Sequence, residues 1–523
     1  MTDKLYVLGA AGAVAIAVYS YFLRRRKSNL PLPPGPRKLP IIGNLLDMPP
    51  TFEWLTYMEW SKKYNSDVLH LNVAGTSIVI LSSAEAANEL LEKRATNYSD
   101  RFVYLFIADL PMVNELMGWK FALAFMKHDD HWRAHRRMFH EVFNQVAAKQ
   151  FHPKERAACN EFLYDVLCRP DHDLLDHLRH MAAKIIMDIA YGITIKPTND
   201  PYVSLANEAV DGLVYALIPG RFLVDNIPLL KYVPAWVPGA GFQRQAAYWG
   251  ALAKDMLEKP FAEAVSIING GKPTHSFIRD GLQIASKDPE RKEYLETVVK
   301  NTAGAMYTAG TGTTVSALGT LVLAMLSNPE ALKKAQEEID RVVGPDRLPD
   351  WDDEPNLPYV VACIKESMRW HNVTPIAIPH YLNVEDEYKG YRLPANSIIL
   401  PNTWAILHDE NVYPDPYSFK PERYLLPNGQ LNPDGPAGPE AVFGFGRRIC
   451  PGRHMGLSSV FITGSSLLAT FDISKAVDAN GSIIEPKYDF FAGLIVTPLS
   501  FKCSLKPRSE KAVALIKASV NKD

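Results

Sequence analysis

The ten residues 443–452, FGFGRRICPG, constrain the fold of this 523-residue chain more than any other stretch. Five of them fit the spacing F-x-x-G-x-R-x-C-x-G, which arises by chance in roughly one chain in ten thousand. The cysteine, Cys450, stands just before a segment with apolar helical periodicity, at about 452–471. The dipole of such a helix would favour a thiolate, and Gly446 and Gly452 would let a bound group approach the sulfur closely. A lone cysteine is otherwise a small buried apolar residue.

Weaker patterns occur elsewhere in the chain. HWRAHRRMF contains a W-x-x-x-R, Trp132 and Arg136, whose members lie one helical turn apart. Glu366 and Arg369 form an E-x-x-R, a spacing that places both side chains on one face of a helix, and FKPERYL supplies Arg423 later in the chain. Each pattern alone is common, and their order along the chain together with Cys450 gives them weight.

In this combination, the chain resembles the cytochrome P-450 family, the haem-thiolate monooxygenases. The resemblance implies that Cys450 is the axial ligand of a haem b iron, with Phe443 and Gly446 in the haem-binding loop; a thiolate ligand favours cleavage of the O–O bond. It also implies a mainly α fold with small β-sheets (α+β) behind one N-terminal transmembrane helix. The periodicity agrees, with a hairpin at 67–83, helices over about 129–343, and β-like runs at 378–404 and 478–505.

The resemblance also implies roles for charged and polar residues around the haem. The haem propionates would be held by four side chains: Trp132, Arg136, Arg448 and His380. Arginine offers two parallel hydrogen bonds to a carboxylate, and the indole N–H offers one more. A buried charge triad, Glu366, Arg369 and Arg423, would lock the loop that presents Cys450.

Residues 309–314, AGTGTT, align with the family pattern A/G-G-x-D/E-T-T/S on the helix that crosses the distal haem face. Ala309 and Gly310 would leave room for O2. Thr313 would bond its own i−4 carbonyl or an inserted water, open the helix locally, and relay protons beside Thr314. These four residues are the predicted catalytic positions.

Gly312 departs from the family pattern, because it replaces the usual acid. No Asp or Glu lies between Glu296 and Glu330. Protons would then pass through threonine hydroxyls, water or the substrate. Three interpretations stay open: an NADPH-driven monooxygenase; a haem-thiolate isomerase, dehydratase or peroxide-user; and a haem-binding protein that has lost catalysis.

The N-terminus predicts a membrane anchor. Residues 5–23 carry no charge and are just long enough to span the hydrocarbon layer, and RRRK follows at 24–27. The positive-inside rule then places the catalytic domain in the cytosol, on a single-pass protein of the endoplasmic reticulum. A cleaved signal peptide is the alternative. We thus expect an anchor at 1–27, a proline-rich hinge at 28–50 and a haem-thiolate domain at 51–523.

Segment 219–241, apolar and proline-rich, would either dip into the bilayer or form a buried loop.

Composition limits the partners. The net charge of −2 argues against nucleic acid, and five cysteines without a C-x-x-C pair argue against a disulfide framework or zinc site. The resemblance implies NADPH–cytochrome P-450 reductase as electron donor, with cytochrome b5 as a second one and membrane lipid as a further contact. The reductase would dock on a basic face formed by four residues: Arg136, Arg137, Arg447 and Arg453.

The resemblance extends to fungal microsomal members of secondary metabolism, in the group of O-methylsterigmatocystin oxidoreductases and mushroom tryptamine hydroxylases. The residues that carry it are VNELMGW (113–119), VPAWVPGA (233–240) and NTWAILHDENVYPDP (402–416). The family's pocket walls map to five segments: 100–124, 205–245, 301–309, 372–378 and 490–495. The last three contain no charged side chain, which favours a small lipophilic substrate. We expect a terpenoid first and an aromatic or indole compound second.

Overall fold

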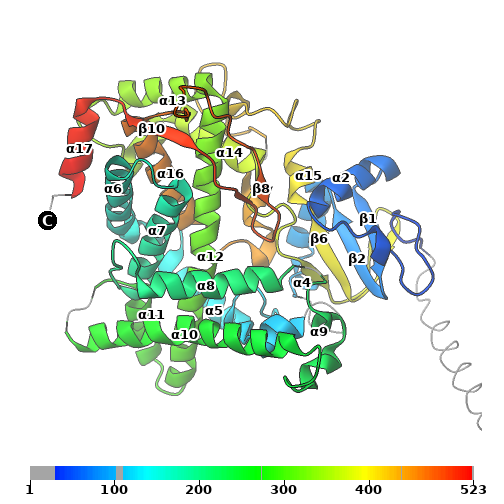
Figure 1. Cartoon of the computed structure of the whole chain (residues 1–523). Helices are drawn as coiled ribbons and strands as arrows, with labels where there is room; N and C mark the ends of the chain where they lie inside the picture. Colours follow the sequence, from blue (N-terminus) through cyan, green and yellow to red (C-terminus); the bar gives the residue numbers. More distant parts are fainter. Residues whose placement is uncertain (1–29, 102–109, 219, 272–273, 437–438, 521–523) are drawn as a thin grey trace, which may run out of the picture.

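A computed structural model describes residues 30–101, 110–218, 220–271, 274–436 and 439–520 (Figure 1). The predicted anchor at 1–27 lies outside the described residues. The described chain forms a large helical body with a small sheet at one end, which agrees with the predicted mainly α fold with small sheets.

The helical body is built from long amphipathic or buried helices joined by short turns. Its helices are α5 (Asp130–Phe143), α6 (His152–Cys168), α7 (Leu174–Ile186), α8 (Pro201–Ala216), α9 (Leu223–Asn226), α10 (Gly241–Asn269), α11 (Phe277–Ser286), α12 (Lys292–Ser327), α13 (Pro329–Val342), α14 (Pro358–Trp370), α16 (Arg453–Thr470) and α17 (Glu510–Val520). Short 3₁₀ or π segments used below are η2 (Asn88–Lys93), η3 (Leu110–Leu116), η7 (Pro228–Tyr232), η8 (Trp351–Asn356), η9 (Pro421–Tyr424), η10 (Pro439–Phe443) and η11 (Gly446–Arg448).

The sheet end contains α2 (Glu53–Tyr64), α3 (Ala84–Ala87), α4 (Ala95–Tyr98), α15 (Thr403–Leu407), β1 (Val68–Val73), β2 (Thr76–Leu81), β3 (His380–Leu382), β4 (Asp386–Tyr388), β5 (Tyr391–Leu393) and β6 (Ser397–Pro401). The strand order is β1-β2-β6-β3, with β2 and β6 parallel and the other pairs antiparallel. The predicted hairpin at 67–83 is the β1–β2 pair. Three further two-stranded ladders include β7 (Phe471–Lys475), β8 (Phe490–Phe491), β9 (Thr497–Pro498) and β10 (Cys503–Pro507).

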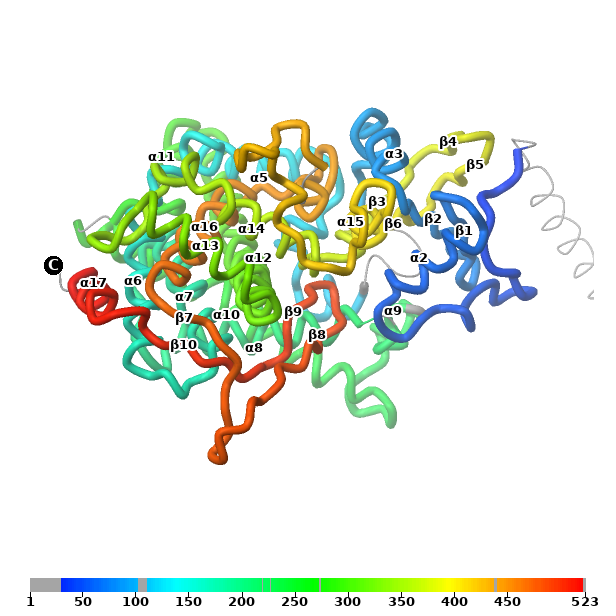
Figure 2. The backbone as a smooth tube through the Cα atoms, turned by 90° about the horizontal axis from the view of Figure 1, so that it is seen from above, coloured from blue at the N-terminus to red at the C-terminus, as the bar shows by residue number. Residues whose placement is uncertain are grey.

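The helix α12 is the centre of the body. It runs without interruption through the predicted long helix and packs against α5, α7, α11, α14 and α16 (Figures 1 and 2). From Val315 to Leu326 every residue is buried, since helices cover it on all sides. Within the described residues, α12 is the one helix long and apolar enough to cross a membrane, and its burial marks it as a core helix.

The proline-rich segment after residue 30 lies against the sheet end. The N–H of His70 donates to the carbonyl of Pro34 at 3.0 Å, and the N–H of Arg392 donates to that of Pro31 at 2.8 Å. Gly35 packs so closely that a Cβ there would lie 2.6 Å from the carbonyl oxygen of His70. The described part of the predicted 28–50 hinge is thus attached to β1 and β5.

Candidate functional site

The Cys450 loop is a short irregular segment between η10 and α16. The N–H of Cys450 donates to the carbonyl of Phe443 at 2.7 Å and closes the loop. Gly446 has φ +56°, and a Cβ there would lie 2.1 Å from the carbonyl oxygen of Leu91 in η2. Only glycine combines that backbone conformation with such close packing, which explains its place in the motif.

The Cys450 sulfur lies at the start of α16. Burial raises the pKa of the Cys450 thiol, and four groups oppose this effect: the backbone N–H groups of Gly452 and Arg453 and the guanidiniums of Arg136 and Arg453. The first N–H groups of a helix have no partner within the helix, so they are free to donate to an anion. Cys450 is therefore a half-buried thiol whose pKa burial raises, and the groups that oppose this effect are placed to stabilise a metal-bound thiolate.

A cluster of buried cations lies beside this loop. Arg448, in η11, donates from Nε to the carbonyl of Ser99 at 2.6 Å and from Nη2 to that of Met126 at 2.8 Å, and its guanidinium lies 4.3 Å from the ring of Trp132. Arg136, one turn after Trp132 on α5, donates to the carbonyl of Ile449 at 2.8 Å. Burial lowers the pKa of Arg448 to about 9. The structure thus brings Trp132, Arg136 and Arg448 together.

His380 and Arg101 complete the cluster. His380 Nδ1 lies 2.9 Å from the carbonyl oxygen of Tyr98, so Nε2 is left for another partner. Arg101 donates to the carbonyls of Ala124, Ile378 and Pro379, and burial together with the charge of Arg448 holds its pKa well below the usual range. Sequence reasoning missed Arg101, because a single arginine after Asp100 has no spacing pattern that would distinguish it from a surface residue.

This cluster fits the propionates of a haem. Three guanidiniums, those of Arg101, Arg136 and Arg448, are largely buried, and none forms a salt bridge with a carboxylate among the described residues. Nη1 of Arg448 is buried without a hydrogen-bond partner in the same part of the chain. Asp100 and Asp129 act on Arg448 without forming a salt bridge among the described residues. Buried cations without a bonded anion are costly, so the cluster favours the binding of an anionic group.

The predicted triad is present and buried. Arg369 donates from Nε and Nη2 to both oxygens of Glu366, at 2.7 and 2.8 Å, and both side chains have 0% exposure. Arg423, in η9, donates from Nε to Glu366 at 3.3 Å and from Nη1 to the carbonyl of Pro414. Arg369 also donates to the carbonyl of Leu407 at 3.0 Å. The triad therefore joins α14 to the loop segments that precede the cysteine loop.

The opposite wall of the site is one face of α12. Ala309 is exposed although it lies in the most buried helix of the chain, and Ala305, one turn earlier, packs near Leu123, Met126 and Trp132. Thr313 lies one turn after Ala309 and therefore on the same face. Ala309 and Thr313 thus border a space within the body.

The threonines of α12 do not open the helix. The hydroxyls of Thr308, Thr311, Thr313 and Thr314 each donate to the carbonyl four residues earlier, at 2.9, 3.2, 2.7 and 2.8 Å. The local opening predicted at Thr313 is therefore not seen, because its hydroxyl adds a bond to an intact helix. The same bond leaves the oxygen of Thr313 able to accept from a second group.

The two glycines of this stretch differ. A Cβ on Gly310 would lie 2.6 Å from Cδ1 of Ile186, so the lack of a side chain lets α12 approach α7 closely. This packing gives one reason for glycine at position 310, and the room for O2 that we expect there stays a prediction. A Cβ on Gly312 would meet only Cδ1 of Ile495, at an ordinary 3.8 Å.

The predicted pocket walls converge on this face of α12. Ser316 donates to the carbonyl of Val496, and the N–H of Val496 donates to that of Val373 at 2.8 Å. Segments 372–378 and 490–495 therefore adjoin α12. The other two predicted wall segments, 100–124 and 205–245, are also linked to each other. Asp225 of α9 accepts the N–H of Met112 at 3.0 Å, which joins their described parts.

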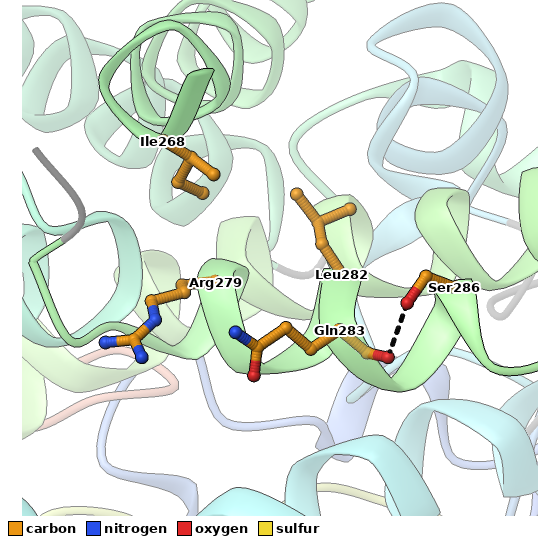
Figure 3. Close-up of a pocket in the computed structure, with 5 residues that line it drawn as sticks. All are labelled: Ile268, Arg279, Leu282, Gln283 and Ser286. Atoms are coloured by element: carbon orange, nitrogen blue, oxygen red, sulfur yellow. Dashed lines mark hydrogen bonds between the residues drawn. The ribbon is translucent and has the colours of Figure 1, made fainter. Parts of the chain in front are cut away.

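A separate hollow lies between α10 and α11. It has a volume of about 340 Å³ and is lined by Ile268, Arg279, Leu282, Gln283 and Ser286 (Figure 3). None of these residues belongs to the cysteine loop, the cation cluster or the α12 face. The hollow therefore plays no part in the site described above.

These features define a haem-thiolate site: a half-buried cysteine facing helix N–H groups, a buried cation cluster and an uncharged helix face. The sequence model described as Cytochrome P-450 matches residues 33–503, and the chain belongs to this family. The chain is 46% identical to cytochrome P-450 monooxygenase 98 of Postia placenta, over 97% of this chain and 96% of that protein. It is 42% identical to monooxygenase ple1 of Rhodocybe pseudopiperita (98% and 96%) and 39% identical to tryptamine 4-monooxygenase of Psilocybe cyanescens (97% and 99%). The protein is thus a cytochrome P-450 monooxygenase, an oxidoreductase that incorporates oxygen and holds haem.

Proposed function

We propose that this protein is a membrane-anchored monooxygenase that hydroxylates or otherwise oxidises a small lipophilic substrate with O2 and electrons from NADPH. A reductase would deliver the electrons, and the pathway would be fungal secondary metabolism. The observation that carries the proposal is that two uncharged wall segments, 372–378 and 490–495, adjoin α12, whose own uncharged segment 301–309 leads into the face that carries Ala309 and Thr313. The haem, when bound, supplies the iron at which O2 is activated.

The same walls favour a terpenoid over an indole amine. One relative is a tryptamine 4-monooxygenase, and the ammonium group of tryptamine requires a carboxylate or another polar partner. The three uncharged segments contain no Asp or Glu and hold a substrate by shape alone. An indole without a charged side chain is the second substrate class.

Thr313 is the residue proposed to handle protons. Its hydroxyl donates to the carbonyl of Ala309, and its oxygen is left to accept from water or substrate in the space beside Ala309. With glycine at 312, α12 offers no carboxylate there, so protons would move through hydroxyls and water.

Membrane attachment has support from the surface as well as from residues 5–23. In segment 219–241, Leu229, Tyr232 and Trp236 have exposures of 75%, 72% and 81%. Ile41 and Leu46, in the segment before α2, have exposures of 94% and 75%. Both segments lie toward the end of the molecule that carries β1 and β2 (Figures 1 and 2). Large apolar side chains in such numbers favour contact with a bilayer over the alternative of a buried loop.

This orientation can be tested by glycosylation. Three N-x-S/T sequons occur, at Asn97, Asn372 and Asn480. With the domain in the cytosol on the endoplasmic reticulum, none of them should carry glycan in a eukaryotic host. Glycan at any of the three would refute the proposed topology.

The electron donor is proposed to dock beside the Cys450 loop, with cytochrome b5 as a second donor. Arg137 and Arg447 are exposed there, near Arg136 and Arg453, and none of the four has a carboxylate partner in the described chain. Complementary charge mainly accelerates encounter with an acidic partner. The electron-transfer rate should therefore fall as salt rises, because salt screens exposed charges. A rate indifferent to salt would argue against this docking face.

The substrate proposal is tested with microsomes that contain the protein and a reductase. NADPH consumption, peroxide and product are measured with terpenoid and indole panels. Product coupled to NADPH supports the proposal. Product without NADPH consumption supports the alternative of an isomerase, dehydratase or peroxide-user, which Gly312 favours. The absence of both product and NADPH consumption supports a protein that has lost catalysis.

A further inference from the structure

A buried carboxyl group, outside the cation cluster and the triad, joins three elements behind the cysteine loop. Glu155 lies on α6 and has 1% exposure. Ser458 Oγ donates to Glu155 Oε2 at 2.7 Å, and Ser459 Oγ donates to Oε1; both serines belong to α16. Trp351 of η8 donates from Nε1 to Ser458 Oγ at 2.7 Å. One carboxyl group thus connects α6, α16 and η8.

The surroundings of Trp351 reinforce this junction. The ring of His152 stacks on it with a centroid distance of 3.8 Å, and the guanidinium of Arg156 lies 5.0 Å from its centre. Both residues belong to α6, as Glu155 does. Trp351 therefore cannot move without disturbing α6, and Ser458 is held from two sides.

The junction includes α16, the helix whose first N–H groups face the Cys450 sulfur. Ser458 and Ser459 lie within two turns of the start of α16, where Gly452 and Arg453 present their N–H groups to Cys450. A helix is stiff over two turns, so a shift at the serines moves these N–H groups as well. Residues that hold a metal ligand in position without touching the metal strongly affect how tightly the metal is retained.

We propose that Glu155 is a positioning residue that holds the start of α16, and with it the N–H groups of Gly452 and Arg453, against the Cys450 sulfur. This inference rests on the haem-thiolate assignment and does not depend on the substrate. Glu155 touches neither the sulfur nor the cation cluster in the described contacts, and acts through α16.

Among the described residues, no cation forms a salt bridge with Glu155. On its own helix, Arg156 donates to Asp350 at 2.9 Å, Cys159 is a buried thiol, and His152 has its pKa lowered by burial. From α16 only the two serines contact the carboxyl group. Burial raises the pKa of Glu155 to about 7, against the smaller opposing effect of the serine hydroxyls. Below about pH 7 the acid is therefore neutral because of burial, and one of the two serine oxygens, which donates to the ionised form, then accepts the carboxyl proton.

The sign of the pH dependence follows from the raised pKa. In an arrangement where α16 has shifted and Glu155 meets water, the carboxyl group would have its ordinary, lower pKa. The ordered arrangement thus binds a proton more tightly, and its advantage is full below that ordinary pKa and is lost as pH rises toward about 7. Retention of haem should weaken over the same pH range.

The test uses the purified full-length holoenzyme and two variants, Glu155→Gln and Glu155→Ala. Haem retention is measured as the rate of haem transfer to an apo-globin, and thiolate ligation as the carbon-monoxide band of the reduced protein. Glu155→Gln keeps the size and hydrogen-bonding ability of the neutral acid and should match the wild type near pH 5, without the decline toward pH 7. Glu155→Ala should release haem roughly tenfold faster.

Glu338→Gln is the matched control. Glu338 is another buried carboxyl group with a raised pKa; it accepts the N–H groups of Tyr359 and Val360 at the start of α14, and no hydrogen bond joins it to α16 in the described chain. Its substitution should lower stability and leave the pH profile of haem release unchanged. The proposal is overturned if wild type and Glu155→Gln lose haem with the same pH profile, or if Glu338→Gln removes the decline as well. Should Glu155→Ala fail to fold, the Gln variant still decides.

Discussion

The two sides of the site are built on different principles. On the cysteine side, position is fixed by directed bonds: Cys450 to Phe443, Arg136 to Ile449, and Glu366 to two arginines. On the α12 side, the threonine hydroxyls turn back to their own helix, and the adjoining wall segments 372–378 and 490–495 carry no charge. The cysteine side holds the Cys450 thiol in one position, whereas the α12 side borders a space without directed bonds into it. Changes to the cysteine side should therefore abolish the site, and changes to the α12 side should adjust its chemistry.

The largest effect is expected from Cys450→Ala. The variant loses the only sulfur that faces the N–H groups of Gly452 and Arg453 in the described chain. Monooxygenase activity should fall to background, and the carbon-monoxide band characteristic of thiolate-ligated haem should disappear. Cys363→Ala is the control, because Cys363 is a buried thiol on α14 with its pKa raised well above the usual range, and it should keep the band. A band that survives Cys450→Ala would contradict the assignment.

Glu366→Ala tests whether buried charge fixes the cysteine side. The variant leaves Arg369, fully buried, and Arg423 without their carboxylate. The free energy of unfolding should fall by about 3–5 kcal/mol, with loss of haem, as measured by urea denaturation.

The surface ion pair between Asp340 and Arg508 provides the comparison. Its atoms approach to 2.7 Å, and the carboxylate is 55% exposed. Asp340→Ala should cost less than about 1 kcal/mol, because water and salt screen an exposed pair. Equal losses for Glu366→Ala and Asp340→Ala would show that burial of the triad is unimportant.

The contrast between the two sides also explains what could be predicted from sequence. Directed bonds need particular residue types at fixed spacings, so Cys450, Trp132, Arg448 and the triad were recognisable in advance. Arg101 was not, because it reaches the cluster through the fold and bonds only to carbonyls.

On the α12 side, the motif at 309–314 identified the segment that borders the site, but not what each of its side chains packs against or bonds to. The helix was predicted, as was its place in the site. The contact of Gly310 with Ile186 and the unbroken helix at Thr313 depend on how α7 packs and on local bond geometry, which spacing does not encode. The proposed substrate space adjoins uncharged segments, and many sequences produce such a lining.

Thr313→Ala should have a moderate effect confined to chemistry. Removing the hydroxyl beside Ala309 takes away the proposed proton relay, so peroxide per NADPH should rise severalfold and product should fall, with haem retained. Thr311→Ala is the matched control: its hydroxyl makes the same kind of i−4 bond, to Tyr307 at 3.2 Å, and lies two residues from Thr313, on another face of the helix. If both variants behave like the wild type, α12 does not serve oxygen activation, and the isomerase or peroxide-using alternative gains weight.

Gly312→Asp is expected to have the smallest and most informative effect. Aspartate in a helix interior is no worse than glycine, and the first atom of its side chain would meet only Ile495 at 3.8 Å, so the fold should tolerate it. If proton delivery limits the enzyme, the new carboxylate should raise product formed per NADPH consumed and lower peroxide, most clearly above the carboxylate's pKa, where it is able to accept protons. If Gly312 instead makes room for the substrate or for water, the variant should lose turnover at unchanged coupling. Product, peroxide and NADPH measured together separate the two, because only a proton-transfer role changes their ratio. An improved ratio would show that the α12 side, unlike the cysteine side, can be altered in its chemistry without disturbing the position of the haem.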